Sequence, residues 1–220
     1  MLGRICKASR TAEPCIMPKE RLAALLEAAE SVFLEKGYHL ATMNDIAKAA
    51  GMSKKTIYAV AGSKIDLFFS ILADHQEKIT LPTPEPHWSV ADTLTAHLVT
   101  LGRFLLDPAQ IALMRLMLAE YTHSPDFGRH FMRSKLAKTK ERLEETLTGI
   151  ARAQGFSTAD AKEFSAMLFG MALGEFQIGT LVGFRTPPSR AALEARVRRA
   201  VEIFLAGCGA GAAQPPVTDI

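Results

Sequence analysis

The residues from Thr42 to Tyr58 constrain the fold more than any other part of the chain, because they predict two short helices joined by a tight turn. Thr42 is placed to cap the first helix, and Asp45 follows three residues later, as in a capping box. Gly51 can take the left-handed conformation that ends this helix, and Ser53 is placed to cap the second. The segment therefore has the layout of a helix-turn-helix.

Two lysines, Lys54 and Lys55, fall in the first turn of the predicted second helix. The positive end of the helix dipole disfavours cations there and favours anions. A phosphate backbone against this helix would turn the local penalty into attraction, and side chains at the start of a recognition helix are those that reach base edges. Taken singly, the two lysines could be merely solvated. Their combination with the caps and the turn favours DNA recognition.

The rest of the chain predicts an all-α fold. Apolar residues recur at helical spacing in almost every segment, and no run of alternating or β-branched residues predicts a strand. With 48% hydrophobic residues, the 220-residue chain can bury a large core, and its net charge of +3 is too small to indicate nucleic-acid binding by itself. Cys6, Cys15 and Cys208 lie near the two ends without Cys-x-x-Cys spacing, which favours a reducing cytoplasm over a disulfide framework or a zinc site.

Composition divides the chain into four parts. Residues 1–18 are expected to be a disordered basic leader, with an arm that reaches a minor groove as the alternative. The helix-turn-helix domain with its connecting helix is expected over 19–79, its first helix ending before Gly37, and a larger helical domain over 80–206. Residues 207–220 predict a disordered tail. The helices expected in the larger domain, out of about nine in the chain, are 89–106, 108–122, 126–154, 158–184 and 189–206.

The helix-turn-helix segment resembles the TetR family of ligand-responsive transcriptional regulators. The resemblance rests on Thr42, Ile46-Ala47, Gly51-Met52-Ser53, Thr56-Ile57-Tyr58 and Lys64. It is specific over about residues 20–75, and beyond them it rests on the number, length and order of the helices. It implies a three-helix DNA-binding domain followed by a helical domain that binds a ligand and dimerises. After Tyr58 the family commonly has Tyr or His and then Phe, whereas this chain has Ala59-Val60-Ala61.

The resemblance also implies roles for single residues. Thr42, Thr56, Tyr58 and Lys64 would hold phosphates, while Met43, Lys54 and Lys55 would face the major groove beside Ser53. Hydroxyls and lysines donate to phosphate oxygens, and a lysine that reaches guanine carries sequence information. The expected partner is a double-stranded DNA operator with two-fold symmetry, bound by a homodimer. Because Ala59-Val60-Ala61 lacks two of the family's anchors, we expect weaker binding or an unusual operator.

An apolar run from Phe164 to Phe184 contains one charge, Glu175, and is long enough for a membrane span. A helix buried on all sides in a helical bundle has the same composition, and we favour that interpretation and expect no membrane partner. By the resemblance, residues 158–206 form the dimer surface. The candidate dimer residues are Gly170, Gly174, Ile178 and Val182.

Methionine and aromatic side chains on the middle helices suggest an adaptable apolar pocket, although plain core packing explains the same pattern. Polar residues inside apolar runs, such as Arg115, Glu120 and Glu175, either pair with one another or meet a ligand, and we favour internal pairing. The candidate ligand-binding residues are Phe104, Met114, Arg115, Met117, Tyr121, Phe127, Phe131, Met171 and Glu175. The expected effector is a small apolar or amphipathic molecule.

These patterns predict a cytoplasmic, homodimeric repressor that a small molecule releases from its operator, with a ligand-dependent activator as an open alternative. The sequence has no recognisable catalytic motif, phosphate-binding loop or histidine cluster, so we expect no enzyme activity, cofactor or metal. The rival hypothesis is an all-α enzyme or small-molecule carrier that keeps a helix-turn-helix shape without binding DNA. It draws on the missing anchors after Tyr58.

Overall fold

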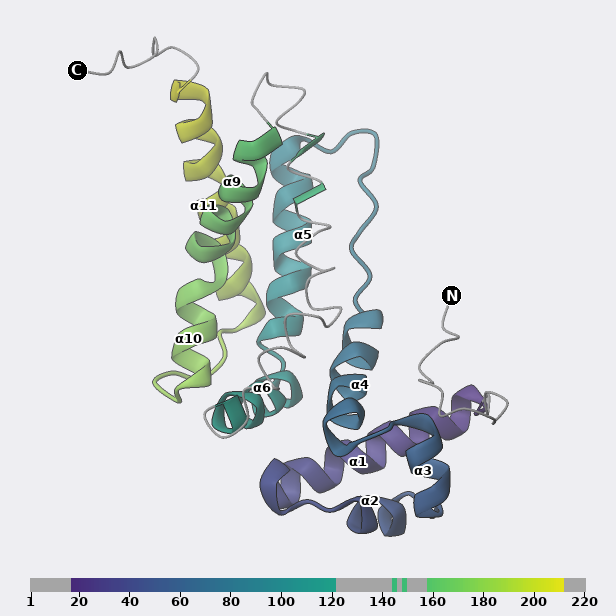
Figure 1. The fold of residues 1–220 in the computed structure, drawn as a ribbon. Coiled ribbons are helices and arrows are strands. Elements are labelled where there is room, and N and C mark those ends of the chain that lie inside the picture. The colour runs from purple at the N-terminus through teal and green to yellow at the C-terminus, as the bar shows by residue number, and fades with distance from the viewer. Residues whose placement is uncertain (1–16, 122–143, 146–147, 150–157, 212–220) are drawn as a thin grey trace, which may run out of the picture. The chain divides into compact units, whose positions relative to one another are not determined.

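The computed structural model describes residues 17–121, 144–145, 148–149 and 158–211, and the secondary structure in these ranges is helical (Figure 1). The predicted all-α fold is confirmed. Most of the helix expected at 126–154 and residues 1–16 of the expected leader lie outside the described residues. The described helices are α1 (Lys19–Leu40), α2 (Met43–Ala49), α3 (Lys54–Val60), α4 (Lys64–Glu77), α5 (Val90–Leu105), α6 (Pro108–Tyr121), α9 (Thr158–Phe169), the π-helix η1 (Gly170–Gly174), α10 (Glu175–Leu181) and α11 (Arg190–Gly211).

The chain forms two compact units. The described part of the first unit comprises residues 17–78 and 112–121, and that of the second comprises 79–111 and the described residues from 144 onward. Helix α6 is therefore divided, with its first turn in the second unit and the rest in the first.

The first unit is built around α1, which packs against α2 and α4, while α2 packs against α3. The apolar residues of α1 face the core of the unit, since Leu25, Ala29 and Phe33 have no exposed surface. Gly37 interrupts the helix with φ of +77°, a left-handed conformation that favours glycine. The predicted stop at Gly37 is therefore confirmed, although helical turns resume and continue to Leu40.

An aromatic cluster joins the break in α1 to α4. Tyr38 stacks on Phe33 with ring centroids 5.4 Å apart, and Phe68 of α4 meets both rings edge-on, at 5.5 Å from Tyr38 and 5.6 Å from Phe33. Such offset and edge-to-face pairs stabilise a core by about 0.5–1.5 kcal/mol each beyond their buried area. The cluster fixes the residues that lead into α2.

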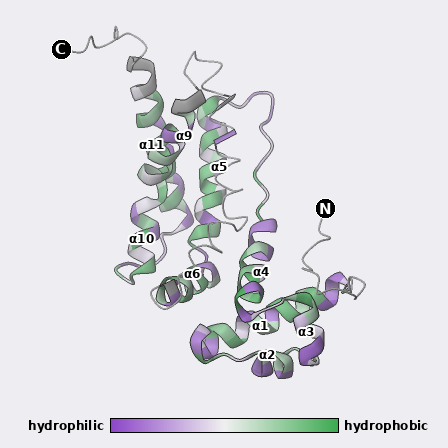
Figure 2. Cartoon of the chain, in the orientation of Figure 1, coloured by the Kyte–Doolittle hydropathy of each residue, from purple (hydrophilic) through white to green (hydrophobic). Residues whose placement is uncertain are grey.

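In the second unit, α5 packs against α11 and η1, and η1 also contacts α9, α10 and α11. Figure 2 shows the hydrophobic residues along α5 and α6 and the hydrophilic residues on the outer sides of α2 and α3. The largest described cluster of buried apolar residues in the second unit comprises Leu94, Leu98, Leu101, Leu106, Leu168, Ala172, Leu173, Leu193, Val197, Ala200 and Val201.

Two helices of the second unit differ from the sequence predictions. The segment expected as one helix over 158–184 contains the π-helical turn Gly170–Gly174 and ends at Leu181. A π turn frees a backbone carbonyl, and here the Arg196 side chain donates its Nε–H to the Met171 oxygen at 3.1 Å. Helix α11 continues to Gly211, so the prediction that a disordered tail begins at Gly207 is wrong for residues 207–211.

Candidate nucleic-acid interface

The first turn of α2 is fixed by a reciprocal cap. The Thr42 hydroxyl oxygen accepts from the Asp45 N–H at 3.2 Å, and Asp45 Oδ2 accepts from the Thr42 N–H at 3.0 Å, which confirms the predicted capping box. Lys36 of α1 adds an ion pair, with its Nζ 2.8 Å from Asp45 Oδ1. Hydrogen bonds from Lys36 and Thr42 hold the pKa of Asp45 well below its usual range. The start of α2 is thereby tied to α1.

The turn and the start of α3 also follow the prediction. Gly51 has φ of +61°, in the left-handed region. The Ser53 hydroxyl oxygen caps α3 by accepting from the Thr56 N–H at 3.1 Å, and it lies 2.8 Å from the Thr56 hydroxyl. Ile57 is fully buried and anchors the inner face of the helix. The opposite face is thereby turned to solvent.

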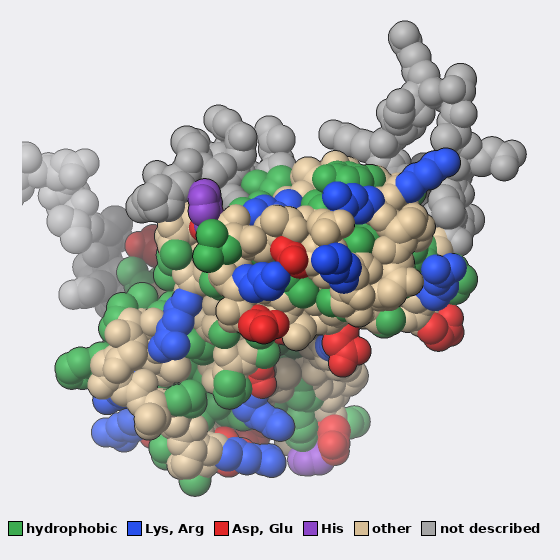
Figure 3. Space-filling view, turned by 90° about the horizontal axis from the view of Figure 1, so that it is seen from below, with side chains coloured by type: hydrophobic (Ala, Val, Ile, Leu, Met, Phe, Trp, Pro, Cys, Tyr) green, Lys and Arg blue, Asp and Glu red, His purple; other side chains and the backbone are tan. Residues whose placement is uncertain are grey.

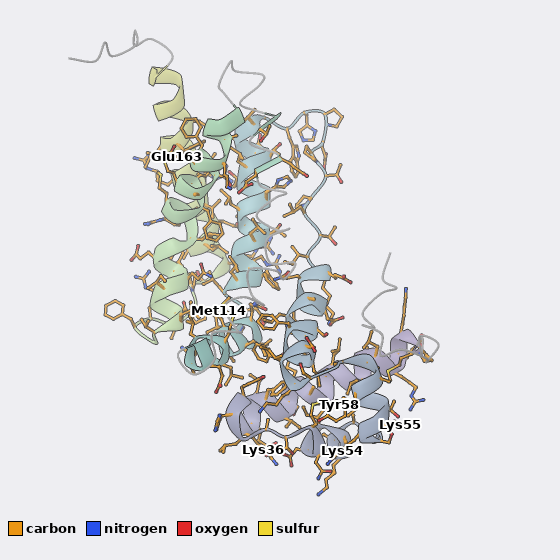
Figure 4. The ribbon with its side chains drawn as sticks, in the orientation of Figure 1. Lys36, Lys54, Lys55, Tyr58, Met114 and Glu163 are labelled. Atoms are coloured by element: carbon orange, nitrogen blue, oxygen red, sulfur yellow. The ribbon has the colours of Figure 1, made fainter. Side chains whose placement is uncertain are left out.

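The outer face of α3 presents hydrogen-bond donors. Lys54 and Lys55 are exposed, and Tyr58 has 49% of its surface exposed (Figure 4). Thr56 can direct its hydroxyl proton outward when Ser53 supplies the hydrogen of the bond between the two hydroxyls. We call Lys54, Lys55, Thr56 and Tyr58 the α3 face. Two ammonium groups and two hydroxyls on a helix about 10 Å long can reach phosphates and base edges of a few base pairs.

Charge around the α3 face is mixed. The view from below shows lysine and arginine side chains separated by aspartate and glutamate, without a single continuous basic patch (Figure 3). Lys36 is neutralised by Asp45. Within the described part of the chain, by contrast, neither Lys54 nor Lys55 has an ion-pair partner. These two lysines therefore carry positive charge on the α3 face that no acidic side chain among the described residues neutralises.

Met43 does not lie where its predicted role requires. Only 8% of its surface is exposed, and it packs in the core of the first unit with Ile46 and Ala47. A methionine at the first position of α2 completes the apolar face of that helix, and this packing outweighs the groove position implied by the resemblance. The prediction that Met43 faces the major groove is wrong.

Lys64 is also directed inward. Its ammonium group donates to the backbone carbonyls of Tyr38, His39 and Ala41 at 2.8, 3.2 and 2.9 Å. A lysine has three N–H donors, so these carbonyls use all of them and leave none for a phosphate. The structure therefore contradicts the predicted phosphate contact of Lys64.

Thr42 keeps an exposed position, but its hydroxyl proton is engaged. The hydroxyl donates to Asp45 Oδ2 at 2.6 Å, so a phosphate oxygen would have to displace a carboxylate to accept that proton. Thr42 therefore serves first as the cap of α2. The α3 face holds the donors best placed for a polyanion.

The predicted ligand-binding residues are divided between the two units. Met114 and Met117 are buried in the first unit, whereas the half-buried Phe104 and the 36% exposed Met171 belong to the second. Arg115 is exposed. The Tyr121 side chain, Phe127 and Phe131 lie outside the described residues.

Glu175 takes part in internal ion pairs. One carboxylate oxygen lies 3.2 Å from an Arg185 nitrogen and the other lies 3.3 Å from an Arg196 nitrogen, and 60% of the side chain is exposed. An exposed carboxylate between two guanidinium groups does not line a buried pocket. Glu175 is therefore paired within the protein, but with Arg185 and Arg196 and not with the other polar residues singled out from the sequence, and its contact with a ligand stays a prediction.

Two buried polar side chains of the second unit were missed. Gln110 in α6 and Ser165 in α9 are each 1% exposed, and their side-chain polar atoms have no hydrogen-bond partner among the described residues. An unpartnered buried amide or hydroxyl is destabilising by about 1–3 kcal/mol. A signal was present, because each residue interrupts an apolar run in the same way as the polar residues that were singled out.

The predicted dimer residues lie on an exposed apolar surface. Ile178 and Val182 are 62% and 72% exposed, and Met167 on α9 is 52% exposed. Gly170 and Gly174 lie on the same run of helix, and a Cβ atom added at either would meet nothing within 4 Å in the monomer. One side of this helix is therefore open in the monomer, which is the side that the predicted dimer would cover.

One described helix, Ala161–Leu181, is long and apolar enough to cross a membrane by length and composition, with 33% of its most apolar window buried. The core helix of a soluble protein meets the same criteria, so this finding is weak evidence for a membrane span. No group of three or more His, Cys, Asp or Glu side chains that could hold a metal ion occurs among the described residues.

Two family profiles match the chain. Residues 25–71 match the profile of bacterial regulatory proteins of the tetR family, and residues 92–210 match that of the C-terminal domain of AefR-like transcriptional repressors. The first covers α2, α3 and most of α1 and α4, and the second begins in α5 and ends in α11.

Curated relatives match only part of the chain. The HTH-type transcriptional activator FasR of Mycolicibacterium smegmatis is 42% identical over 60 residues, which are 27% of this chain and 27% of that protein. The HTH-type transcriptional repressor BepR of Brucella suis is 43% identical over 53 residues, which are 24% of this chain and 25% of that protein. The chain thus spans about a quarter of the length of these two relatives.

Solved structures match over most of the chain. The flavonoid-responsive regulator FrrA is 27% identical, with a TM-score of 0.70, over 86% of this chain and 97% of the other. Together with the two profiles, this likeness extends the resemblance seen in residues 42–64 to the second unit. The chain belongs to the TetR family of bacterial transcriptional regulators.

Proposed function

We propose that this chain binds a two-fold operator DNA as a homodimer and represses transcription until a small neutral molecule releases it. The observation that carries the proposal is the α3 face, where Lys54, Lys55, Thr56 and Tyr58 are presented on a capped helix whose inner side is anchored by Ile57. Hydroxyls and ammonium groups fix register on phosphates, and a lysine at the start of a recognition helix can also read guanine.

The proposal of repression, as opposed to activation, rests on the second unit. FasR is an activator and BepR a repressor, and the stretches that match this chain are short in both, so the DNA-binding segment alone favours neither sign. Residues 92–210 match the C-terminal domain of AefR-like repressors, which supports repression. Deletion of the gene should therefore raise transcription from its operator, and a fall in transcription would overturn the repressor proposal.

The dimer is proposed to form through the open side of η1 and α10. Ile178 and Val182 supply apolar surface there, and Gly170 and Gly174 leave room for close approach of a second helix. A homodimer would offer two α3 faces to successive major-groove segments of a two-fold site. Ile178→Glu should dissociate the dimer in analytical ultracentrifugation, and an unchanged sedimentation coefficient would place the interface elsewhere.

The proposed effector is neutral and amphipathic. None of the described residues that are buried is an acid, a lysine or an arginine, whereas Gln110 and Ser165 hold unpartnered polar atoms inside an apolar unit. An amide can donate and accept at once, which suits hydroxyl and carbonyl groups on an apolar skeleton. The likeness to a flavonoid-responsive regulator supports the same chemical class. Calorimetric titration with a flavonoid should give binding that Gln110→Leu weakens, and equal affinity for both proteins would remove Gln110 from the site.

The first test of the function is retention of the DNA that flanks the gene for this protein, in an electrophoretic mobility assay across a salt series with nonspecific competitor. The logarithm of the binding constant should fall against the logarithm of salt with a slope of about −0.9 per phosphate contacted. The double variant Lys54→Ala/Lys55→Ala should lose retention. The matched control, Lys78→Ala/Arg103→Ala, removes the same charge from exposed positions outside α3 and should retain the DNA.

The carrier or enzyme hypothesis predicts a different outcome. Wild-type protein would then show no preference over competitor even at low salt, and the Lys54→Ala/Lys55→Ala variant would behave as the control does. That result would refute the proposed DNA binding and direct attention to Gln110 and Ser165.

A further inference from the structure

Lys64 occupies the first position of α4, yet its side chain serves the connection between α1 and α2. Its Nζ donates to the carbonyl oxygens of Tyr38 at 2.8 Å, His39 at 3.2 Å and Ala41 at 2.9 Å. These carbonyls lie where α1 ends, and the last carbonyls of a helix have no partner within it. One ammonium group therefore satisfies three carbonyl acceptors at the break in α1 and at its end.

The same ammonium lies over an aromatic face. Lys64 Nζ is 4.4 Å from the centroid of the Tyr38 ring, a cation–π distance. That ring is held between Phe33 and Phe68, so the position of the ammonium is fixed by the core of the unit. Three hydrogen bonds and a ring contact at once restrict a lysine that would be flexible on an open surface.

The Lys64 side chain is half-buried beside a negative charge on α6. Burial lowers the pKa of Lys64, and the negative charge of Glu120 on α6, within the same unit, opposes that shift. A buried ammonium group destabilises a protein unless it has hydrogen-bond partners and a nearby opposite charge, and Lys64 has both.

The carbonyls bound by Lys64 immediately precede the DNA-binding segment. Ala41 is followed by Thr42, the cap of α2, and α2 packs against α3. Ala41 itself is 1% exposed, so its carbonyl has no competing access to water. Any shift of residues 38–41 would move the start of α2 and, through it, the α3 face.

We infer that Lys64 is a positioning residue for DNA binding, which fixes the α1–α2 connection through the Tyr38, His39 and Ala41 carbonyls and so holds the α3 face in register with the groove. The inference rests on the proposed function. It assigns to Lys64 a contribution to operator affinity without a contact to the phosphate backbone.

Two substitutions distinguish positioning from a phosphate contact. Lys64→Met removes the charge and the three donors, and Lys64→Arg keeps a cation but replaces a compact ammonium by a planar guanidinium that cannot direct three N–H groups to converging carbonyls. A phosphate contact would tolerate arginine. If Lys64 is a positioning residue, either substitution should weaken binding of the protein to its operator, while the protein stays folded at the assay temperature.

The salt series supplies the second criterion. If Lys64 positions, Lys64→Arg should weaken specific binding with the salt slope unchanged and should lower the ratio of specific to competitor binding. If Lys64 bound a phosphate in each protomer, Lys64→Met would reduce the magnitude of the slope by about 1.8, since each lost contact contributes about 0.9. A slope reduced in Lys64→Met together with full affinity in Lys64→Arg would overturn the inference.

Hydrogen exchange on the free protein keeps the inference testable without DNA. Amide exchange in residues 38–46 should accelerate by roughly tenfold or more in both variants, because even one hydrogen bond to a charged group has that weight, while exchange in α5 and α11 stays unchanged. Unchanged exchange in residues 38–46 would overturn the inference even if wild-type protein binds its operator. If exchange accelerated in both variants but the wild-type protein did not bind DNA, the proposed function would be refuted, whereas the role of Lys64 in fixing the α1–α2 connection would stand.

Discussion

Gly102 allows α5 to approach the helices on either side of it, and its replacement by alanine tests the packing of the second unit. A Cβ atom at Gly102 would lie 2.8 Å from Leu173 Cδ2 and 3.0 and 3.2 Å from the two Leu193 methyl carbons. Leu173 and Leu193 are 1% and 3% exposed, so their methyl groups cannot swing into solvent. Carbon atoms prefer about 3.5–4.0 Å, so α11 or η1 must shift.

Two opposing effects set the magnitude. Alanine favours a helix over glycine by about 1 kcal/mol, whereas overpacking a buried site costs about 1–3 kcal/mol. Gly102→Ala should therefore lower the free energy of unfolding by about 0–2 kcal/mol. Gly207→Ala in α11 is the matched control, since a Cβ there meets nothing within 4 Å and only the gain in helix propensity applies. The two variants should differ by about 1–3 kcal/mol.

The assay is urea unfolding at one fixed protein concentration, because the proposed dimer would make apparent stability depend on concentration. A double-mutant cycle with Leu193→Ala isolates the contact. If the clash is real, Leu193→Ala should destabilise the Gly102→Ala protein by about 0.5–3 kcal/mol less than it destabilises wild type. If Gly102→Ala stabilised the protein as much as Gly207→Ala and showed no coupling to Leu193→Ala, the close approach of Leu173 and Leu193 to Gly102 would be refuted.

Two further predictions concern pH. Burial, with smaller contributions from Glu120 and Asp66, raises the pKa of Tyr38 to about 12, so the unfolded chain ionises this phenol from pH 10 upward while the folded chain keeps it neutral. The free energy of unfolding should fall between about pH 10 and 12, and the Tyr38→Phe variant should lack the part of this fall that comes from Tyr38. If the variant lost as much stability as wild type over this pH range, the argument from burial would be contradicted. The pKa of Asp45 is lowered by Lys36 and Thr42, so its contribution is present above the unfolded value near 4 and is lost as pH falls below it. The Asp45→Asn variant should be less stable than wild type at pH 7, and its free energy of unfolding should change less between about pH 4 and 2. If the two proteins gave parallel curves of unfolding free energy against pH, the Lys36–Asp45–Thr42 contacts would have no role in stability.

Local signals explain why the helix-turn-helix could be predicted. Thr42 with Asp45, Gly51, and Ser53 all act within three residues of their own position, so spacing in the sequence is enough to place them. The apolar stripe of α1 is equally local, because helical periodicity alone determines which side chains share a face. The fold class and the ends of most helices follow from such features.

The errors arose where a partner lies far away in the sequence. The resemblance implies a phosphate contact for Lys64, and nothing near position 64 shows that carbonyls 23 to 26 residues earlier converge on it. Glu175 is paired by Arg196 and by Arg185 across a turn, and the π-helical carbonyl of Met171 is bound by the same Arg196. Met43 shows a different limit, since a residue type suited to a groove contact is equally suited to a core. A sequence predicts which groups need partners and leaves several possible partners for each.

The departure Ala59-Val60-Ala61 affects the interface and the support of α3 differently. Ala61 is 1% exposed, and its N–H donates to the Ile57 oxygen at 2.8 Å, so a small side chain closes the inner end of α3 without an aromatic anchor. Ile57 and the Ser53 cap hold the remainder of the helix. Ala59 is exposed, and neither it nor Val60 has a side chain that can donate to a phosphate. Relative to the family pattern, the departure therefore removes side chains that could donate to phosphates and leaves the helix supported. A weak operator complex would follow from fewer phosphate contacts, and the salt slope, which counts those contacts, would be shallow while amide exchange in α3 stays slow.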